Sequence, residues 1–198
     1  MRNSGRMARV SAVVGLLFCI LPPAAFADDL DDAVLAEINF ARANPADYAR
    51  ELRRQAVSAQ RGDYSANDPE AVEEAIDFLQ RQPALPPLAW DDRMAVAARE
   101  HTRAQGPRGD VGHGAAGGLG QRLRGADVWA GLSAENISYG YDDARDVVRQ
   151  LIIDSGVPTR GHRHNIFGTG YRLAGVSCGP HRAHGAMCTI DFAGALAR

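Results

Sequence analysis

The sequence predicts an α+β fold, and three observations lead to this prediction. Apolar residues recur at helical spacing in several segments between residues 28 and 101. Two stretches near the C-terminus, Tyr171–Cys178 and Ala186–Phe192, alternate loosely between apolar and polar residues and favour strands. No internal repeat or low-complexity linker interrupts the 198 residues, so we expect one domain that covers residues 28–198.

The first 27 residues have the pattern of an export signal. An apolar run at residues 10–21 is too short to be a comfortable membrane span, and Ala25-Phe26-Ala27 is a small-residue cleavage pattern. Cys19 leaves a lipoprotein anchor as an alternative. We expect a secreted protein, extracellular or periplasmic, whose mature chain begins at Asp28. The basic residues that precede the apolar run are Arg2, Arg6 and Arg9.

The charge of the chain argues against one class of partner. The full sequence has a formal net charge of −2, and loss of three arginines with the signal takes it to about −5. A mildly acidic exported domain is a poor candidate for nonspecific nucleic-acid binding. We therefore expect a monomer that has no nucleic-acid partner.

Four helices are expected in the first half of the chain. The second and third each begin at an Asx–Pro pair, Asn44-Pro45 and Asp68-Pro69, in which the Asx residue caps the helix and the proline fits its first turn. Asp91 marks the start of the fourth helix. The expected helices cover residues 28–41, 46–57, 69–80 and 91–101, with a polar loop at 58–67 and a proline-rich extended stretch at 83–90.

The second half of the chain mixes loop, strand and helix patterns. Residues 106–120 contain seven glycines and favour an irregular loop, in which His113 is the unusual member. This loop does not resemble a phosphate-binding loop, because no Gly-Lys-Ser/Thr follows the glycines. Leu132–Tyr139 is expected to form a strand, and a helix over residues 143–153 is expected to be capped by Asp142.

Cys178 and Cys188 are the two cysteines that remain after the signal is removed. A Gly-Pro turn signal separates the two C-terminal strands, so the cysteines would be cross-strand neighbours. An even pair in an oxidising compartment suggests a disulfide, which would stabilise the fold by roughly 2–3 kcal/mol. Two buried thiols are the alternative. His181 and His184 lie in the expected hairpin loop.

Four polar residues stand beside glycine or at an expected element boundary: His113, Glu135, Asp154 and His162. Glu135 interrupts a strand-like run, and a buried carboxylate costs several kcal/mol unless it has a partner. Two histidines and two acids suit a divalent cation such as Zn²⁺, held by His113 and His162. They also suit a metal-free acid–imidazole network, or an acid–base site in which Glu135 or Asp154 is the catalytic candidate. The segment Asp154–Asn165 reads as an ordinary polar loop if no such site exists.

Five segments together resemble one known family. Leu85–His101 is similar to its L-x-W-x-x-x-L-x-x-x-A helix, and Val111–His113 to its first histidine motif. Ala134–Ile137 resembles the G-E-N-[IL] motif, with alanine in place of the usual glycine. Gly161–Ile166 resembles the bacterial G-H-R-x-N-[IL] motif, and Ala174–Val176 the strand that follows it. The family is the CAP superfamily of cysteine-rich secretory proteins, antigen 5 and pathogenesis-related 1 proteins, also called SCP-like.

The resemblance implies a three-layer α-β-α sandwich with a central antiparallel sheet. It also implies a cleft in which two histidines and two acids meet, here His113, Glu135, Asp154 and His162. Two departures concern the third position: many members have glutamate where this chain has Asp154, and tryptophan where it has Leu151.

Three functions remain open from the sequence, and whether the protein is an enzyme is one of the open points. The first is a module that binds a small molecule, a lipid or a cell-envelope component, with residues 46–57 and 69–80 either lining an apolar groove or packing in the core. The second is a metal-dependent, peptidase-like hydrolase, for which no nucleophile motif is visible and Ser133 lacks an evident base. The third is a purely structural polar network. If a metal binds, protons compete with it for both histidines, so its affinity should fall below about pH 6.

Overall fold

A computed structural model describes residues 24–59, 68–114 and 118–196 of the chain. Most of the expected export signal falls outside these ranges. No helix in the described part is long and apolar enough to cross a membrane. The helices are α1 (Ala24–Ala43), α2 (Pro45–Ala59), α3 (Pro69–Arg81), α4 (Asp92–Gln105), α5 (Gly118–Gly125), α6 (Ala144–Ile153) and α7 (Gly161–Ile166). The strands are β1 (Ala89–Trp90), β2 (Ser133–Tyr139), β3 (Leu173–His181) and β4 (Gly185–Ala193).

Short polar side chains begin the helices much as the sequence predicts. The Asp68 carboxylate accepts a hydrogen bond from the Glu70 amide at α3, and the Asp91 carboxylate caps α4. The cap of α6 is Asp143 rather than Asp142, so that prediction was wrong by one residue. At α2 the Asn44 side chain donates to the Phe40 carbonyl and thus closes the end of α1.

Two short helices replace loops that the sequence suggests. The C-terminal part of the expected glycine-rich loop enters α5, and the second half of the segment 154–165 forms α7. Short helices rich in glycine have little helical signal of their own, because glycine is a poor helix former and tertiary packing decides the outcome. The polar loop interpretation of the segment 154–165 therefore holds only for its first half.

The sheet has the strand order β1-β3-β4-β2. Strands β3 and β4, and β2 and β4, pair antiparallel as expected, while the two residues of β1 add a parallel pair beside β3. Cys178 lies opposite Cys188 in the β3–β4 register, and the predicted disulfide between them is confirmed. The antiparallel pairing of β2 with β4 places Asp191 directly opposite Glu135.

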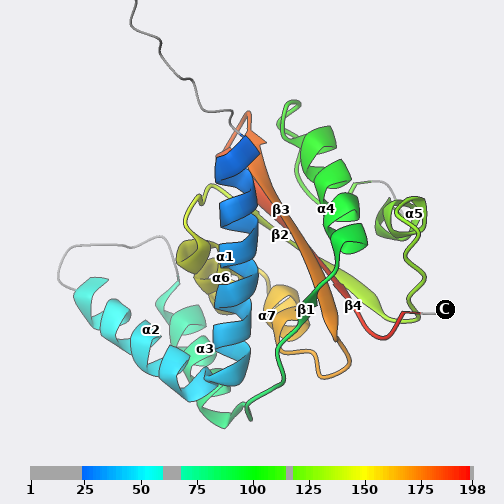
Figure 1. Cartoon of the computed structure of the whole chain (residues 1–198). Helices are drawn as coiled ribbons and strands as arrows, with labels where there is room; N and C mark the ends of the chain where they lie inside the picture. Colours follow the sequence, from blue (N-terminus) through cyan, green and yellow to red (C-terminus); the bar gives the residue numbers. More distant parts are fainter. Residues whose placement is uncertain (1–23, 60–67, 115–117, 197–198) are drawn as a thin grey trace, which may run out of the picture.

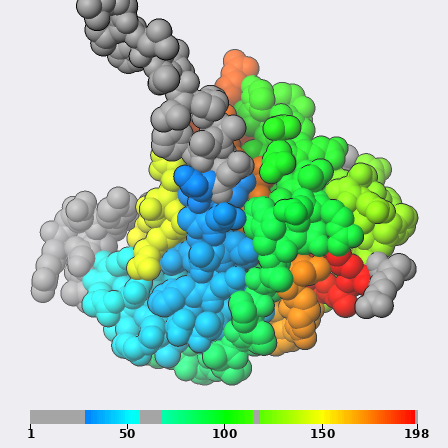
Figure 2. All heavy atoms as spheres, viewed as in Figure 1, coloured from blue at the N-terminus to red at the C-terminus, as the bar shows by residue number. Residues whose placement is uncertain are grey.

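Helices cover both faces of this sheet and make three layers, as the α-β-α prediction requires (Figure 1). Val176 and other alternate residues of β3 join α1, α2, α3 and α6 in the main apolar core. On the opposite face α4 packs so closely that a Cβ atom at Gly175 would lie less than 3.0 Å from backbone atoms of Met94 and Ala95. Figure 2 shows α1, α2 and α4 covering one side of the molecule in blue, cyan and green.

The apolar faces of α2 and α3 belong to the core. Tyr48 and Leu52 of α2, and Ile76 and Leu79 of α3, are almost completely buried within the main apolar cluster. Of the two roles open for these helices, core packing is therefore the one that these side chains have in the structure.

Candidate functional site

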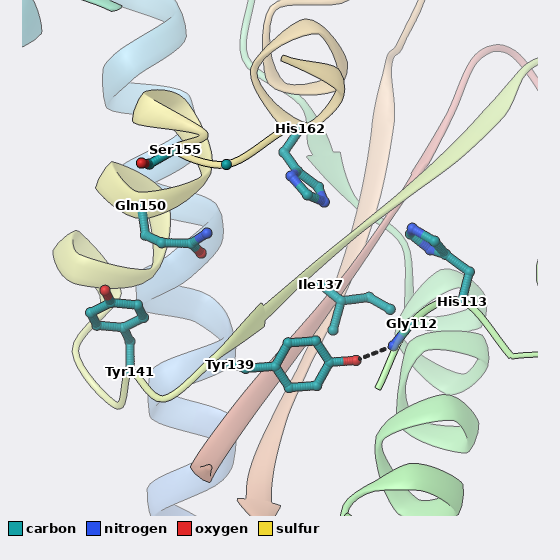
Figure 3. A pocket seen from close by; sticks show the side chains of 9 residues that line it. Gly112, His113, Ile137, Tyr139, Tyr141, Gln150, Ser155 and His162 are labelled. Carbon is teal, nitrogen blue, oxygen red and sulfur yellow. Dashed lines mark hydrogen bonds between the residues drawn. The ribbon is translucent and has the colours of Figure 1, made fainter. Parts of the chain in front are cut away.

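The two histidines that the sequence singles out line the same cavity, which has a volume of about 540 Å³. His113 follows α4, and His162 lies in the first turn of α7, so the cavity joins two segments that are distant in sequence. Figure 3 shows both rings pointing into it from different sides. The other lining residues are Gly112, Ile137, Tyr139, Tyr141, Gln150, Ser155 and Gly156.

The first histidine is paired with a buried acid. His113 Nδ1 donates to Glu135 Oε1 over 2.8 Å, and the other oxygen of Glu135 accepts from the Arg122 guanidinium. The Glu135 side chain is 2% exposed, whereas that of His113 is 59% exposed. The hydrogen bond that His113 donates to Glu135 raises the pKa of His113 above its ordinary value. Burial alone would raise the pKa of Glu135, but hydrogen bonding to His113 and the charge of Arg122 outweigh burial and lower it.

The second histidine is paired in the same way. His162 Nδ1 donates to Asp154 Oδ1 over 2.6 Å, and the His162 backbone amide donates to the other oxygen over 2.9 Å. Asp154 ends α6 in the left-handed region, with φ of 57°, and its side chain is fully buried. Aspartate tolerates this conformation better than most residues do, so the short acid fits the site where many relatives carry glutamate. The structure therefore brings all four predicted residues together as two acid–imidazole pairs.

Two arginines beside His162 hold the turn that carries Asp154. Arg163 is buried, and its guanidinium donates to the carbonyls of Ile152 and Ile153 at the end of α6. Arg160 donates to the carbonyl of Asp154 over 2.8 Å. Both arginines also pair with Glu74 of α3. Because the carbonyls of a helix end need such donors, these arginines support the site rather than line it.

Several residues that matter to the site are not indicated by the sequence. Arg122 lies in a segment for which the sequence analysis predicts no element, and Tyr139 and Gln150 read as ordinary members of a strand and a helix. Asp191 is buried opposite Glu135, and burial together with the negative charge of Glu135 raises the pKa of Asp191 well above its ordinary value. The position of Asp191 beside Glu135 could be found from the sequence only if the register between β2 and β4 were known.

The geometry leaves one nitrogen of each imidazole for a ligand. Both Nδ1 atoms are committed to carboxylates, so Nε2 of His113 and of His162 remains for the cavity. A carboxylate that holds the other ring nitrogen is the usual support of a metal-binding histidine. Within the described ranges no cluster of three or more His, Cys, Asp or Glu side chains is arranged to hold a metal ion. The metal site that the sequence suggests at His113 and His162 therefore stays a prediction.

Comparisons with known proteins identify the family to which the chain is similar. A sequence model of the CAP family, described as the cysteine-rich secretory protein family, matches residues 35–192. An extracellular protein from Bacillus anthracis that contains an SCP domain is 25% identical, with a TM-score of 0.47, over 63% of this chain and 38% of its own length. An outer surface protein from Borrelia burgdorferi is 19% identical, with a TM-score of 0.47, over 63% and 86% of the two chains. A cysteine-rich secretory protein from Staphylococcus aureus is 14% identical, with a TM-score of 0.46, over 67% and 40%.

The similar region thus spans less than half of the Bacillus and Staphylococcus chains. No curated protein matches the chain.

Proposed function

Because the chain belongs to the CAP family of cysteine-rich secretory proteins, we propose that it is a secreted binding domain whose cavity captures a polar component of a cell surface. The observation that carries this proposal is the pair of carboxylate-backed imidazoles, His113 and His162, which line one cavity. Two further groups of that cavity, the Tyr139 ring and the Gln150 amide, offer stacking and hydrogen bonding to a polar ligand.

A lipid ligand has less support than a polar one. The apolar residues of α2 and α3 that would line a groove are packed in the core. The cavity itself is lined by imidazole, phenol, amide and hydroxyl groups as well as Ile137. We therefore expect the protein to bind cell-envelope material through hydrogen bonds or through an ion rather than by burying an alkyl chain.

A divalent ion held by His113 and His162 would supply a positive charge for an anionic group of the ligand. Protons compete for the same ring nitrogens, and the pKa of His113 is raised above 6.5. His113 consequently stays protonated to a higher pH than an ordinary histidine does. During acidification the affinity for the ion should therefore begin to fall at a higher pH than it would with an unpaired histidine in this position.

The positions of the two acids favour binding over hydrolysis. Glu135 and Asp154 are the candidates to activate a water molecule, yet both side chains are buried behind the imidazoles. Their oxygens are already occupied, by His113 and Arg122 for Glu135 and by His162 for Asp154. A general base must reach the proton that it removes, and these carboxylates reach the imidazoles instead.

The test is calorimetric titration of Zn²⁺ into the exported protein at about pH 7.5, where most histidines are neutral. We expect binding by the wild type and at least tenfold weaker binding by His113→Ala and by His162→Ala, because each variant removes one of two ligands. His164→Ala is the matched control, since His164 is an exposed residue two positions from His162. Equal binding by His162→Ala and the wild type would rule out the metal site, and no binding by the wild type would favour the acid–imidazole network.

Binding of a surface component is tested separately, by co-sedimentation of the protein with isolated cell-envelope material. The double variant His113→Ala/His162→Ala should remain in the supernatant, and His164→Ala should sediment like the wild type. Sedimentation of the double variant at the wild-type level would place the binding surface away from this cavity.

A further inference from the structure

The backbone just before His113 is held by side chains from three elements of the fold, α4, β2 and β3. The Gly112 amide donates to the Tyr139 hydroxyl over 2.9 Å, an interaction drawn in Figure 3. The Gly112 carbonyl accepts from Gln105 Nε2 over 2.7 Å and from His101 Nε2 over 3.1 Å. One residue earlier, the Asp110 carbonyl accepts from His181 Nε2 over 2.8 Å. Both backbone groups of Gly112 are thus satisfied by side chains.

These contacts close into a ring of hydrogen bonds. The Tyr139 hydroxyl accepts from Gly112 and donates to Gln105 Oε1 over 3.1 Å, while the amide of Gln105 donates to Gly112. Within this ring the oxygen of the Gln105 amide accepts one hydrogen bond and its nitrogen donates one, so a flipped amide would place like groups against each other. The ring therefore fixes the orientation of the Gln105 amide. His101 Nε2 adds a second donor to the Gly112 carbonyl, and burial lowers the pKa of this ring.

The segment has little else to hold it in place. Val111 is 60% exposed, and the His113 side chain is 59% exposed, so neither anchors the segment by burial. Gly112 has φ of 89° and Gly114 has φ of 77°, conformations that only glycine adopts without strain. A segment that contains conformationally free glycines and exposed side chains depends on its backbone hydrogen bonds for a defined position.

We propose that Tyr139 and Gln105 are positioning residues, which hold Gly112 and thereby keep His113 in hydrogen-bonding contact with Glu135. The proposal rests on the proposed function of the cavity, because His113 acts there through the nitrogen that Glu135 leaves free. Tyr139 also lines the cavity. A ligand that moves the Tyr139 phenol would therefore disturb both the hydrogen bonds to Gly112 and the position of His113. His101 and His181 add donors to the same short stretch of backbone.

The test compares Tyr139→Phe with Tyr141→Phe. Both tyrosines line the cavity, but only the Tyr139 hydroxyl is bonded to Gly112. Loss of the Tyr139 hydroxyl should leave its ring in place, because that ring also packs against His181 and His184 at 5.1 and 5.5 Å. Gln105→Met is the second variant, and it removes the other bond to Tyr139 together with the donor to Gly112.

The readout is the nitrogen NMR spectrum of the His113 ring at about pH 9, where histidine is neutral. The wild type should show the Nδ1–H form that bonds to Glu135, and Tyr139→Phe and Gln105→Met should each show a mixture with the Nε2–H form. The Gly112 amide should exchange with solvent roughly tenfold faster or more in both variants, since Tyr139→Phe removes the acceptor of this amide and Gln105→Met removes two bonds of the same ring. Tyr141→Phe should match the wild type in both measurements.

Wild-type ring signals and Gly112 exchange in both Tyr139→Phe and Gln105→Met would overturn the proposal. These measurements need no ligand, so they decide the positioning role even if the wild type binds no Zn²⁺. If Zn²⁺ does bind, Tyr139→Phe should weaken the binding severalfold, and equal affinity of Tyr139→Phe and the wild type would also count against the proposal.

Discussion

Two carboxyl groups, those of Glu135 and Asp191, face each other across β2 and β4. Both are buried, and two neighbouring carboxylates in one site repel each other, so one of them must keep its proton over a wider pH range. Arg122 and His113 bond to Glu135 and favour its ionised form. Asp191 is left as the group that retains the proton, in agreement with its raised pKa.

We expect Asp191→Asn to be more stable than the wild type at neutral pH. A carboxyl whose folded pKa is raised stabilises the fold fully below its unfolded pKa of about 4, and this contribution is lost as the pH rises toward the folded pKa. An amide of nearly the same shape avoids that loss. The free energy of unfolding in urea should therefore favour Asp191→Asn by an increasing margin between about pH 4 and pH 7. The exposed Asp77→Asn serves as the control, and a margin that does not change with pH would contradict the assignment.

Helix α4 is the element that links packing to the site. It lies on the sheet over Gly175, and its last turn carries His101 and Gln105, which hold the backbone beside His113. Its Thr102 hydroxyl bonds to Ser177 and Thr189 of the sheet. The close approach of this helix requires the absence of a side chain at Gly175.

Gly175→Ala should destabilise the protein by roughly 3 kcal/mol or more, because the added Cβ would collide with the backbone of α4 rather than with a movable side chain. Gly131→Ala is the matched control, since a Cβ there meets no atom within 4 Å. The measurement is urea unfolding of both variants and the wild type. Similar stabilities for Gly175→Ala and Gly131→Ala would show that α4 can move away from the sheet at little cost.

Over the whole molecule, the cavity depends on segments that come together from distant parts of the chain. Helix α1 is joined to the sheet, because the Asp31 carboxylate accepts from the Cys178 amide of β3 over 2.5 Å. The β3–β4 hairpin is closed by the disulfide between Cys178 and Cys188. A disulfide between these cysteines agrees with an oxidising compartment. Cleavage of the export signal before Asp28 stays a prediction.

Replacement of both cysteines by alanine should lower the free energy of unfolding by about 2–3 kcal/mol, the value expected for so short a closed loop. Urea unfolding of the Cys178→Ala/Cys188→Ala variant and the oxidised wild type measures the difference. Reduction of the wild type should produce a loss of the same size. If the variant were as stable as the oxidised protein, the hairpin would be equally ordered without the covalent link.

Local chemistry in the sequence determined the elements that carry their own signals. Asp68 and Asp91 mark the starts of their helices, because capping by a short acid depends only on the next few residues. The alternation around Cys178 and Cys188 predicts two strands close enough for a disulfide. The motifs around Glu135 and His162 indicated the family and, through it, the four residues of the site.

Only the tertiary structure decided which groups surround those four residues. The contacts of Glu135 with Arg122 and Asp191, and of Gly112 with Tyr139, join positions on different elements, and no local pattern encodes them. The same holds for the short helix α7, in which Arg163 binds the end of α6. Propensity and periodicity act between near neighbours in sequence, whereas burial, charge and register act between neighbours in space, and the latter exist only once the chain has folded.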